Sequence, residues 1–151
     1  PPLYQEMTVQ EYLLFVAELK GTRKKADRIA AVENACARTG LQEMEGRLIR
    51  NLSKGYRQRV GIAAALLGTP KIIILDEPTR GIDIGAKTQI YHLMRELAKQ
   101  GKAIIMISSE MPEVIGVSNR IIVVREGRFN GEFEEKDFDA NSIIKCAMGM
   151  N

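Results

Sequence analysis

The stretch of sequence that decides the fold spans residues 72–83 and reads Ile72-Ile73-Ile74-Leu75-Asp76-Glu77-Pro78-Thr79-Arg80-Gly81-Ile82-Asp83. Its apolar residues predict a strand buried in a sheet, and two adjacent carboxylates stand at the end of that strand. In open α/β sheets, ligands bind at the carboxyl ends of the strands. We therefore expect Asp76 to hold Mg²⁺ and Glu77 to align or deprotonate a water that attacks a terminal phosphate. The alternative is a strand that ends in an acidic turn without function, which the upstream sequence disfavours.

A segment suited to anion binding lies upstream and reads Leu52-Ser53-Lys54-Gly55-Tyr56-Arg57-Gln58-Arg59. Ser53 is a favourable N-cap for a helix whose apolar positions share one face, namely Val60, Ala63, Ala64 and Leu67. The start of a helix offers free backbone N–H groups and the positive end of the helix dipole. The segment therefore predicts a phosphate-binding helix start with the flexible Gly55 beside it.

The remaining sequence predicts helices first and then strands that alternate with helices. We expect helices at 8–20, 24–39, 53–68, 83–100 and 139–148, a short helix after Pro112, and strands at 72–77, 103–108, 120–125 and 129–133. A capping box starts the first helix, and Gly21, Gly40 and Gly101 end three of the helices. Residues 41–51 form a connector. This order indicates an α/β fold with a helical front piece and a boundary near Thr69.

Composition limits the class of protein. A chain of 151 residues has the length of one ordinary domain, and 45% hydrophobic residues suffice for a core. No apolar run approaches the roughly 18 residues that cross a bilayer. Cys36 and Cys146 lie far apart without metal-like spacing, which fits free thiols and gives no indication of zinc. The net charge of +3 is spread along the chain, so it gives little support to nucleic-acid binding.

Taken together, these segments resemble the ATP-binding-cassette (ABC) ATPases, and the resemblance covers almost the whole chain. Leu52–Tyr56 is similar to the signature motif LSGGQ, Ile72–Glu77 to the Walker B strand with its catalytic glutamate, and Gly81–Asp83 to the D-loop. The resemblance implies a partial nucleotide-binding domain of the P-loop NTPase (RecA-like) α/β class. Residues 1–69 would be the helical subdomain with the signature motif, and residues 70–151 the C-terminal part of the parallel-sheet core.

The phosphate-cradling loop of this class, GxxxxGK followed by Ser or Thr, does not occur in the chain. In the family this Walker A loop precedes the point where the sequence begins. The sequence therefore resembles a C-terminal fragment with the Walker A half missing, and we expect the fragment alone to be inactive. Family topology places the Walker A strand between residues 103–108 and 120–125. Those two strands would either close directly or leave an apolar slot open.

The resemblance also assigns site residues and two cofactors, ATP and Mg²⁺. Asp76 would hold the Mg²⁺, and Glu77 would be catalytic as a base or water-positioning group. Asp83 in the D-loop would contact the facing subunit and also cap a helix. The residues that would contact ATP held by a second nucleotide-binding domain are Ser53, Lys54, Gly55 and Tyr56.

Three positions depart from the common family pattern. Lys54 and Tyr56 replace the commoner Gly and Gln, which resembles a subfamily mark of exporter-like ABC ATPases. Ser109 stands at the catalytic position where most members have a histidine that contacts the γ-phosphate, and it offers only one short hydroxyl donor. Slower or absent hydrolysis at this chain's own site is therefore our hypothesis.

The two ends of the chain resemble different subfamilies. Residues 1–79 resemble exporter and gliding-motility-type ABC ATPases, whereas residues 80–151 resemble the second ATPase domain of ribose- and galactose-type sugar importers. The mixture predicts a recombined gene or an artificial join near residues 75–80.

The function that the resemblance implies is that of the ATP-binding and ATP-hydrolysing subunit of an ABC transporter, with sugar import as one option. Its partners would be a second ABC nucleotide-binding domain and membrane permease subunits, with no nucleic acid and no direct membrane insertion. It would be cytoplasmic, on the inner face of the cell membrane. Two alternatives stay open: a soluble ABC-type ATPase in nucleic-acid or translation processes, and a non-catalytic, degenerate ABC module.

Overall fold

The structure, a computed structural model, describes residues 3–150 and divides the chain into two compact units, residues 1–107 and 108–151. The length of the chain suggests one domain, whereas its internal contacts define two units. The division that the family resemblance places near Thr69 falls inside the first unit and stays a prediction.

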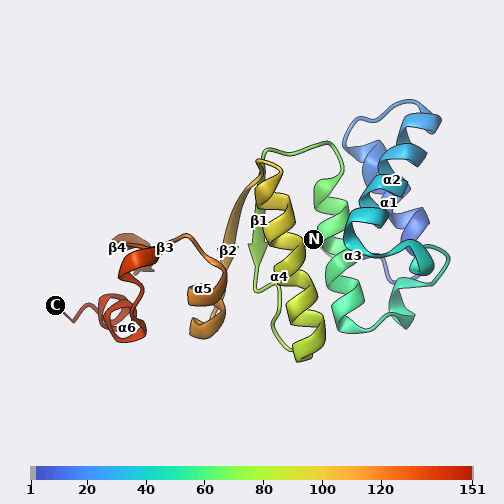
Figure 1. Cartoon of the computed structure of the whole chain (residues 1–151). Coiled ribbons are helices and arrows are strands. Elements are labelled where there is room, and N and C mark those ends of the chain that lie inside the picture. The colour runs from blue at the N-terminus through green and yellow to red at the C-terminus, as the bar shows by residue number, and fades with distance from the viewer. Residues whose placement is uncertain (1–2, 151) are drawn as a thin grey trace. The chain divides into compact units, whose positions relative to one another are not determined.

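The elements follow the expected order of helices first and alternating strands and helices afterwards (Figure 1). The first unit contains α1 (Val9–Leu19), α2 (Lys25–Thr39), α3 (Lys54–Leu66), β1 (Ile72–Asp76), α4 (Ile84–Lys99) and β2 (Ala103–Ile107). The second contains α5 (Met111–Val117), β3 (Arg120–Arg125), β4 (Arg128–Glu134) and α6 (Ala140–Met148). Each expected helix and strand is confirmed, with its ends shifted by no more than two residues.

The predicted capping box fixes the start of α1. The Glu11 N–H donates to Thr8 Oγ1 at 3.2 Å, and the Thr8 N–H donates to Glu11 Oε2 at 2.8 Å. The bond from the Thr8 N–H, and after it the bond that the Thr8 hydroxyl donates to the same Glu11 Oε2 at 2.9 Å, lower the pKa of the Glu11 carboxyl. Thr8 also forms an antiparallel bridge with Leu48 of the connector, which contains two 3₁₀ turns, Gln42–Met44 and Ile49–Asn51. The connector is therefore ordered around the start of α1.

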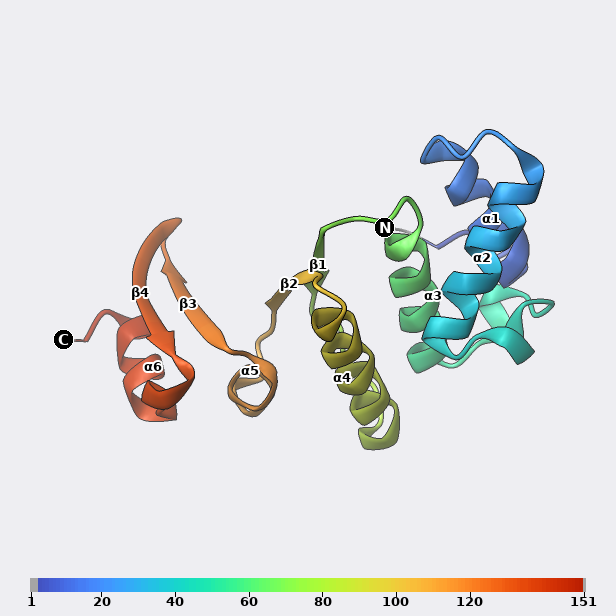
Figure 2. The same ribbon diagram turned by 45° about the horizontal axis from the view of Figure 1, so that its top comes forward.

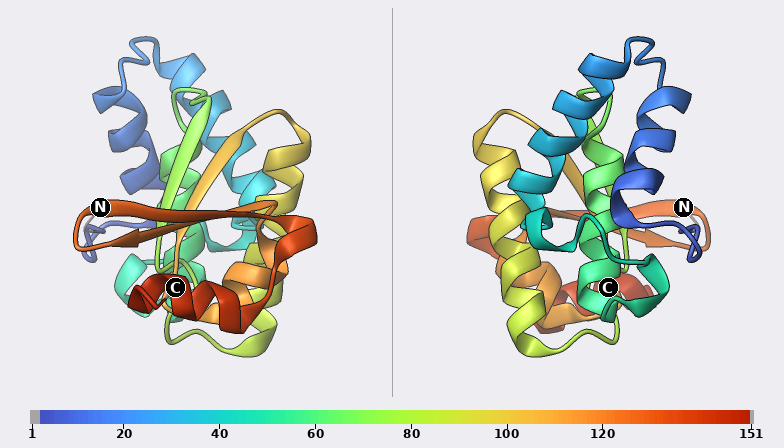
Figure 3. Two further views of the ribbon diagram at one scale, coloured as in Figure 1. Left: turned by 90° about the vertical axis from the view of Figure 1, so that its left-hand side faces the viewer. Right: turned by 90° about the vertical axis from the view of Figure 1, so that its right-hand side faces the viewer.

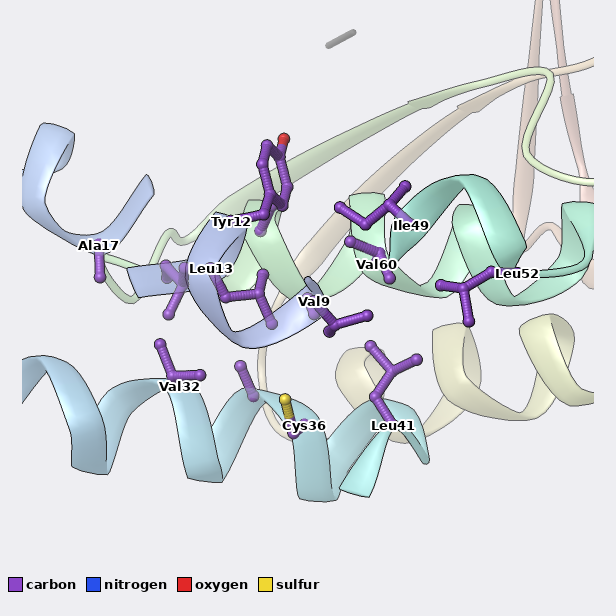
Figure 4. Packing of buried hydrophobic residues seen from close by; sticks show 14 residues of the cluster. Val9, Tyr12, Leu13, Ala17, Val32, Cys36, Leu41, Ile49, Leu52 and Val60 are labelled. Carbon is purple, nitrogen blue, oxygen red and sulfur yellow. The ribbon is translucent and has the colours of Figure 1, made fainter. Parts of the chain in front are cut away.

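A hydrophobic cluster joins α1, α2 and α3 (Figure 4). Each helix presents an apolar face because its apolar residues recur every three or four positions. The connector also contributes fully buried side chains, so it belongs to the core. The fully buried members of the cluster include Val9, Leu13, Val32, Cys36, Leu41, Ile49 and Val60.

A lysine that follows α1 closes the end of α3. Lys20 Nζ donates to the carbonyl oxygens of Ala64 at 2.8 Å, Ala65 at 3.1 Å and Leu67 at 2.9 Å. The last carbonyls of a helix lack intrahelical partners, so a cation here satisfies them and complements the helix dipole. Burial lowers the pKa of Lys20. The contact ties α1 to α3 at the end of α3 remote from the signature segment.

β1 and β2 form a parallel pair in which Asp76 lies opposite Ile107. In Figures 1 and 2, α4 and α3 lie on one side of this pair, and Figure 3 shows the two strands side by side. Successive side chains of a strand point to opposite faces. Ile73 and Leu75 are buried, whereas the residues on the other face, Ile72, Ile74, Ile105 and Ile107, are each more than half exposed. One face of the pair is therefore apolar and open.

The strands at 103–108 and 120–125 fall in different units of the chain. Among the described residues, β2 pairs with β1, and β3 pairs with β4 in a second two-stranded sheet. The two alternatives for these strands, direct closure or an open apolar slot, therefore stay predictions. Within the first unit, the exposed isoleucines of β1 and β2 are unusual, because parallel strands are normally covered on both faces.

The second unit is an antiparallel hairpin packed with a helix. β3 and β4 pair along their length, with a bulge between Val123 and Val124. Ile143 of α6 is buried against Ile121 and Val123 in a small core. Asp139 caps α6 by accepting a hydrogen bond from the Ser142 N–H at 2.8 Å, and its bonds to Ser142, that from the hydroxyl first, lower its pKa. Within residues 3–150, no helix combines the length and the apolar character needed to cross a membrane.

We expect Lys20→Met to lower the free energy of unfolding by about 2 kcal/mol, because three carbonyls lose a charged donor while most of the aliphatic stem is kept. Chemical denaturation measures the change. Lys25→Met, at the exposed first position of α2, is the matched control and should shift the value by less than about 0.5 kcal/mol. Equal destabilisation by both substitutions would contradict the capping role of Lys20.

The two thiols should react differently in the folded chain. Burial, with a smaller contribution from Glu45, raises the pKa of the Cys36 thiol to about 12, whereas Cys146 is only half-buried. Because the thiolate is the nucleophile, Cys36 should stay inert near pH 8. We expect Ellman's reagent to modify one thiol in the folded chain and both in denaturant, and Cys146→Ser to abolish the native reaction. Two reactive thiols in the folded chain would contradict this account.

Candidate functional site

The signature segment forms the start of α3. Ser53 is the N-cap, as predicted, and its Oγ accepts a hydrogen bond from the Tyr56 N–H at 3.3 Å. Lys54 and Gly55 are the first two residues of the helix. Their backbone N–H groups are among those that a helix leaves without an intrahelical acceptor. α3 therefore has the free donors and the dipole end that a phosphate site uses.

Asp76 and Glu77 stand at the carboxyl end of β1. Asp76 ends the strand and is exposed. Glu77 is partly exposed, and its φ of 46° lies in the left-handed region that non-glycine residues rarely occupy. The Glu77 N–H donates to the Ile107 carbonyl at 2.8 Å, and the Glu77 carbonyl accepts from the Arg80 N–H at 3.3 Å. These bonds hold Glu77 in a strained backbone conformation of the kind that clusters at functional sites.

The start of α3 packs directly on the segment that follows β1. A Cβ at Gly55 would lie 2.9 Å from Ala86 Cβ and 3.5 Å from Ile82 Cγ2, so glycine is needed at this contact. Lys54 Nζ lies 2.6 Å from the position that a Cβ on Gly81 would take, and Gly81 has a φ of 68°. The structure thus brings the signature segment and the loop after β1 together.

Gln58 is a further link between the two segments, and the sequence motifs do not point to it. Its Nε2 donates a long hydrogen bond of 3.5 Å to the Glu77 carbonyl. Gln58 follows Gly55 by three positions, so both residues lie on the face of α3 that meets the loop. That helical spacing is the signal that could have found it.

Asp83 caps α4, as predicted. Its Oδ1 accepts a hydrogen bond from the Ala86 N–H at 2.9 Å. Ala86 is also the residue against which Gly55 packs, so the cap and the contact share one residue. The predicted contact of Asp83 with a facing subunit involves a second chain and stays a prediction.

The two remaining predicted residues are Tyr56 and Ser109. Tyr56 packs partly against the helical core, and Arg59 Cζ lies 5.1 Å from the centroid of its ring. Ser109 is exposed and belongs to the second unit, whereas the other predicted site residues belong to the first. The adjacent Ser108 donates to Glu113 Oε2 at 2.7 Å. The catalytic role of Ser109 and the contact of Tyr56 with a nucleotide stay predictions.

The acidic residues suit a magnesium–nucleotide ligand better than a metal held by protein alone. Mg²⁺ is usually bound through one or two carboxylates together with substrate phosphates. Asp76 offers one exposed carboxylate at the strand end. In the described part of the chain, no group of three or more His, Cys, Asp or Glu side chains is placed to hold a metal. The residues present therefore fit a Mg²⁺ ion that brings phosphate ligands with it.

A parallel strand that ends in paired carboxylates, packed beside a capped helix start, is typical of α/β domains that bind ligands at the carboxyl ends of their strands. Comparison with known families makes the assignment specific. The chain belongs to the ABC transporter family, whose model matches residues 1–80. The expected fold, part of an ABC nucleotide-binding domain of the P-loop NTPase class, is confirmed.

Curated relatives are sugar import proteins. The ribose import ATP-binding protein RbsA of Clostridium perfringens is 53% identical over 103 residues, which are 68% of this chain and 21% of the relative. The xylose import ATP-binding protein XylG of Thermoanaerobacter pseudethanolicus is 54% identical over 101 residues, 67% of this chain and 20% of the relative. The chain therefore spans about a fifth of the length of these relatives.

Solved structures share the fold. CbiO1 from Clostridium perfringens, described as part of the ABC transporter complex cbiONQ, superposes with a TM-score of 0.81 at 29% identity over 94% of this chain and 56% of that one. MJ1267, an ATP-binding cassette of an ABC transporter, superposes with a TM-score of 0.83 at 22% identity over 97% of this chain and 63% of that one. The second likeness shows the fold alone.

The similarity to the ribose import protein does not begin at Arg80. It covers 103 residues of the chain, whereas the segment from Arg80 to the end has 72, so at least 31 matched residues lie upstream of Arg80. The change of subfamily near residues 75–80 stays a prediction.

We expect Gly55→Ala to lower the free energy of unfolding by about 1–3 kcal/mol, because its methyl group would overlap Ala86, which has no flexible side chain to move away. Gly61→Ala, in the same helix, is the matched control, since a Cβ there meets nothing within 4 Å. It should instead raise the free energy of unfolding by about 0.5–1 kcal/mol through helix propensity. The same sign of change in both variants would contradict the close approach at Gly55.

Proposed function

We propose that this segment works in the ATP-binding and ATP-hydrolysing subunit of an ABC transporter, in which ATP hydrolysis drives transport of a solute across a membrane. The observation that carries the proposal is the backbone of Glu77, which is held in a left-handed conformation at the carboxyl end of β1. Thr69 and Glu126 also have a positive φ, so the functional argument rests on the place of Glu77 beside Asp76 at the end of a parallel strand, where ligands bind in α/β sheets. The names of the relatives, ribose and xylose import proteins, support a sugar as the cargo.

Bound ATP and Mg²⁺ would supply the reacting phosphates and the positive charge that offsets them. Asp76 would ligate the Mg²⁺ through its exposed carboxylate. The Glu77 carboxylate would accept a hydrogen bond from the attacking water and take its proton. The bonds of the Glu77 backbone to Ile107 and Gln58 restrict where that carboxylate can reach, so the water is aligned before attack.

The start of α3 would bind the γ-phosphate of ATP held by a second nucleotide-binding domain. The Ser53 oxygen accepts from the Tyr56 N–H, which leaves the hydroxyl proton free to be donated to a phosphate. Lys54 adds an ammonium group, and Gly55 lets the backbone approach closely. Because Gly55 packs on Ile82 and Ala86, phosphate binding here would stabilise the loop that carries Glu77.

The partners in this function would be a second ABC nucleotide-binding domain and membrane permease subunits. The description of the solved relative cbiO1 as part of the ABC transporter complex cbiONQ supports this assembly. The subunit would lie on the cytoplasmic face of the membrane, and Asp83 would contact the facing domain.

In the full-length protein that contains this segment, we expect Glu77→Gln to lower ATP turnover by about 100-fold or more, because general-base catalysis contributes factors of this size. ATP binding should persist, since the amide keeps the shape of the carboxylate. Steady-state phosphate release and equilibrium ATP binding measure the two effects. Glu33→Gln, an exposed carboxylate on α2, is the matched control and should keep wild-type turnover. Equal turnover in the two variants would contradict the role of Glu77.

A second substitution tests the effect of Ser109, which stands where most members of the family have a histidine. We expect Ser109→His to raise ATP turnover of the full-length protein by about tenfold or more, because an imidazole donor would stabilise charge on the γ-phosphate. Ser109→Ala should give no such gain. An unchanged rate in Ser109→His would show that Ser109 does not limit hydrolysis, and it would leave the role of Glu77 unaffected.

A further inference from the structure

A pocket of about 270 Å³ opens between the C-terminal end of α2, the middle of α3 and one face of α4. All three helices belong to the first unit. In Figures 1 and 2 α3 lies next to α4, and the right-hand view of Figure 3 looks onto the helical side of this unit. The polar side chains that line the pocket include Arg38, Arg59, Gln89, His92 and Glu96. None of these residues belongs to the proposed ATP site.

The lining of this pocket is positively charged. Arg38 and Arg59 carry guanidinium groups, which stay protonated at any ordinary pH. Glu96 is the one carboxylate among the described lining residues, and Lys99 Nζ lies 2.8 Å from its Oε1. The two guanidinium groups therefore outnumber the one carboxylate of the described lining, and that carboxylate is already paired with Lys99.

Both guanidinium groups are oriented before any ligand arrives. Arg59 Cζ stands 5.1 Å from the centroid of the Tyr56 ring, a stacking contact that uses none of the N–H donors of the guanidinium group. Arg38 Nη2 donates to Gln100 Oε1, which anchors the side chain and leaves its other N–H groups available. On α4, Gln89 and Glu96 lie three positions before and four positions after His92, so all three share one face.

We infer that this pocket binds a small ligand with a multiply charged anionic group, either a phosphate ester or a carboxylate compound. Two preorganised guanidinium forks and an amide are the donors that recognise such oxygens. The volume lies below the 300–1,000 Å³ of common ligand pockets, so it suits a phosphate group with a short organic part better than a nucleotide. Leu93 and the arginine stems supply an apolar wall for that part.

Arg59 could instead serve only to stabilise the end of α2. Its Nη1 lies 3.1 Å from the position that a Cβ on Gly40 would take, and Gly40 is the C-cap of α2. A cation is favourable at the end of a helix. This purely structural role of Arg59 predicts that no ligand binds, so a binding measurement distinguishes it from the anion-binding role.

Isothermal titration calorimetry of the whole 151-residue chain with inorganic phosphate, at constant ionic strength, tests the inference. We expect one phosphate per chain, with Arg38→Gln and Arg59→Gln each weakening binding by about tenfold through loss of a charge-assisted contact. Arg95→Gln removes the same charge from α4 outside the pocket and should leave affinity unchanged. Thermal melts check folding, and if Arg59→Gln unfolds the chain, the half-buried Arg38 decides the outcome.

Three results would each overturn the inference. The first is an absence of binding heat up to about 10 mM phosphate. The second is that Arg95→Gln weakens phosphate binding as much as the two pocket variants do. The third is that Lys54→Gln abolishes binding while neither pocket variant does, because the anion would then lie at the start of α3. Titrations with glycerol phosphate and succinate then separate the two sources. Tighter binding of glycerol phosphate identifies a phosphate ester, and tighter binding of succinate a carboxylate compound.

Discussion

The close approach of Gly55 to Ala86 and Ile82 is the contact on which the candidate site depends. It fixes the start of α3 against the segment that follows β1, so that backbone donors suited to phosphate and the carboxylates of Asp76 and Glu77 belong to one packed region. A side chain at position 55 would separate them, because the partner is a rigid methyl group. The left-handed backbone at Glu77 is held in the same region by its hydrogen bonds to Ile107 and Arg80.

α3 is held at both ends, and this gives the site a rigid support. Its start is fixed by the Gly55 contact, and its last carbonyls accept hydrogen bonds from Lys20. Between these ends, Val60 is fully buried in the cluster shared with α1 and α2. A helix fixed in this way moves with the helical core as one body. The effect of phosphate bound at the start of α3 would therefore reach the loop of Glu77 through this packing.

The elements could be predicted from the sequence because their signals are local. The sequence predicts Thr8, Ser53 and Asp83 as helix caps, and the structure confirms all three. The apolar run at 72–75, followed by carboxylates, identifies the end of the strand. Helical spacing could have placed Gln58 on the face of α3 that carries Gly55, but not its bond to Glu77. The need for glycine at position 55 and the pocket beside Arg59 could not be predicted either, because each joins segments far apart in the chain. The strand isoleucines predict burial on both faces, yet one face is open. A hydrophobic pattern shows that the side chains favour burial, but it does not show whether another element covers them.

The central claim is that the start of α3 and the loop after β1 form one cooperative unit. Amide hydrogen exchange tests it at Tyr56 and Ala86, whose N–H groups donate to Ser53 Oγ and Asp83 Oδ1 respectively. Native-state exchange reports the free energy of local opening at each amide. The account predicts that both amides open with the same free energy and that Gly55→Ala accelerates their exchange by the same factor. Acceleration at Tyr56 with unchanged exchange at Ala86 would contradict it.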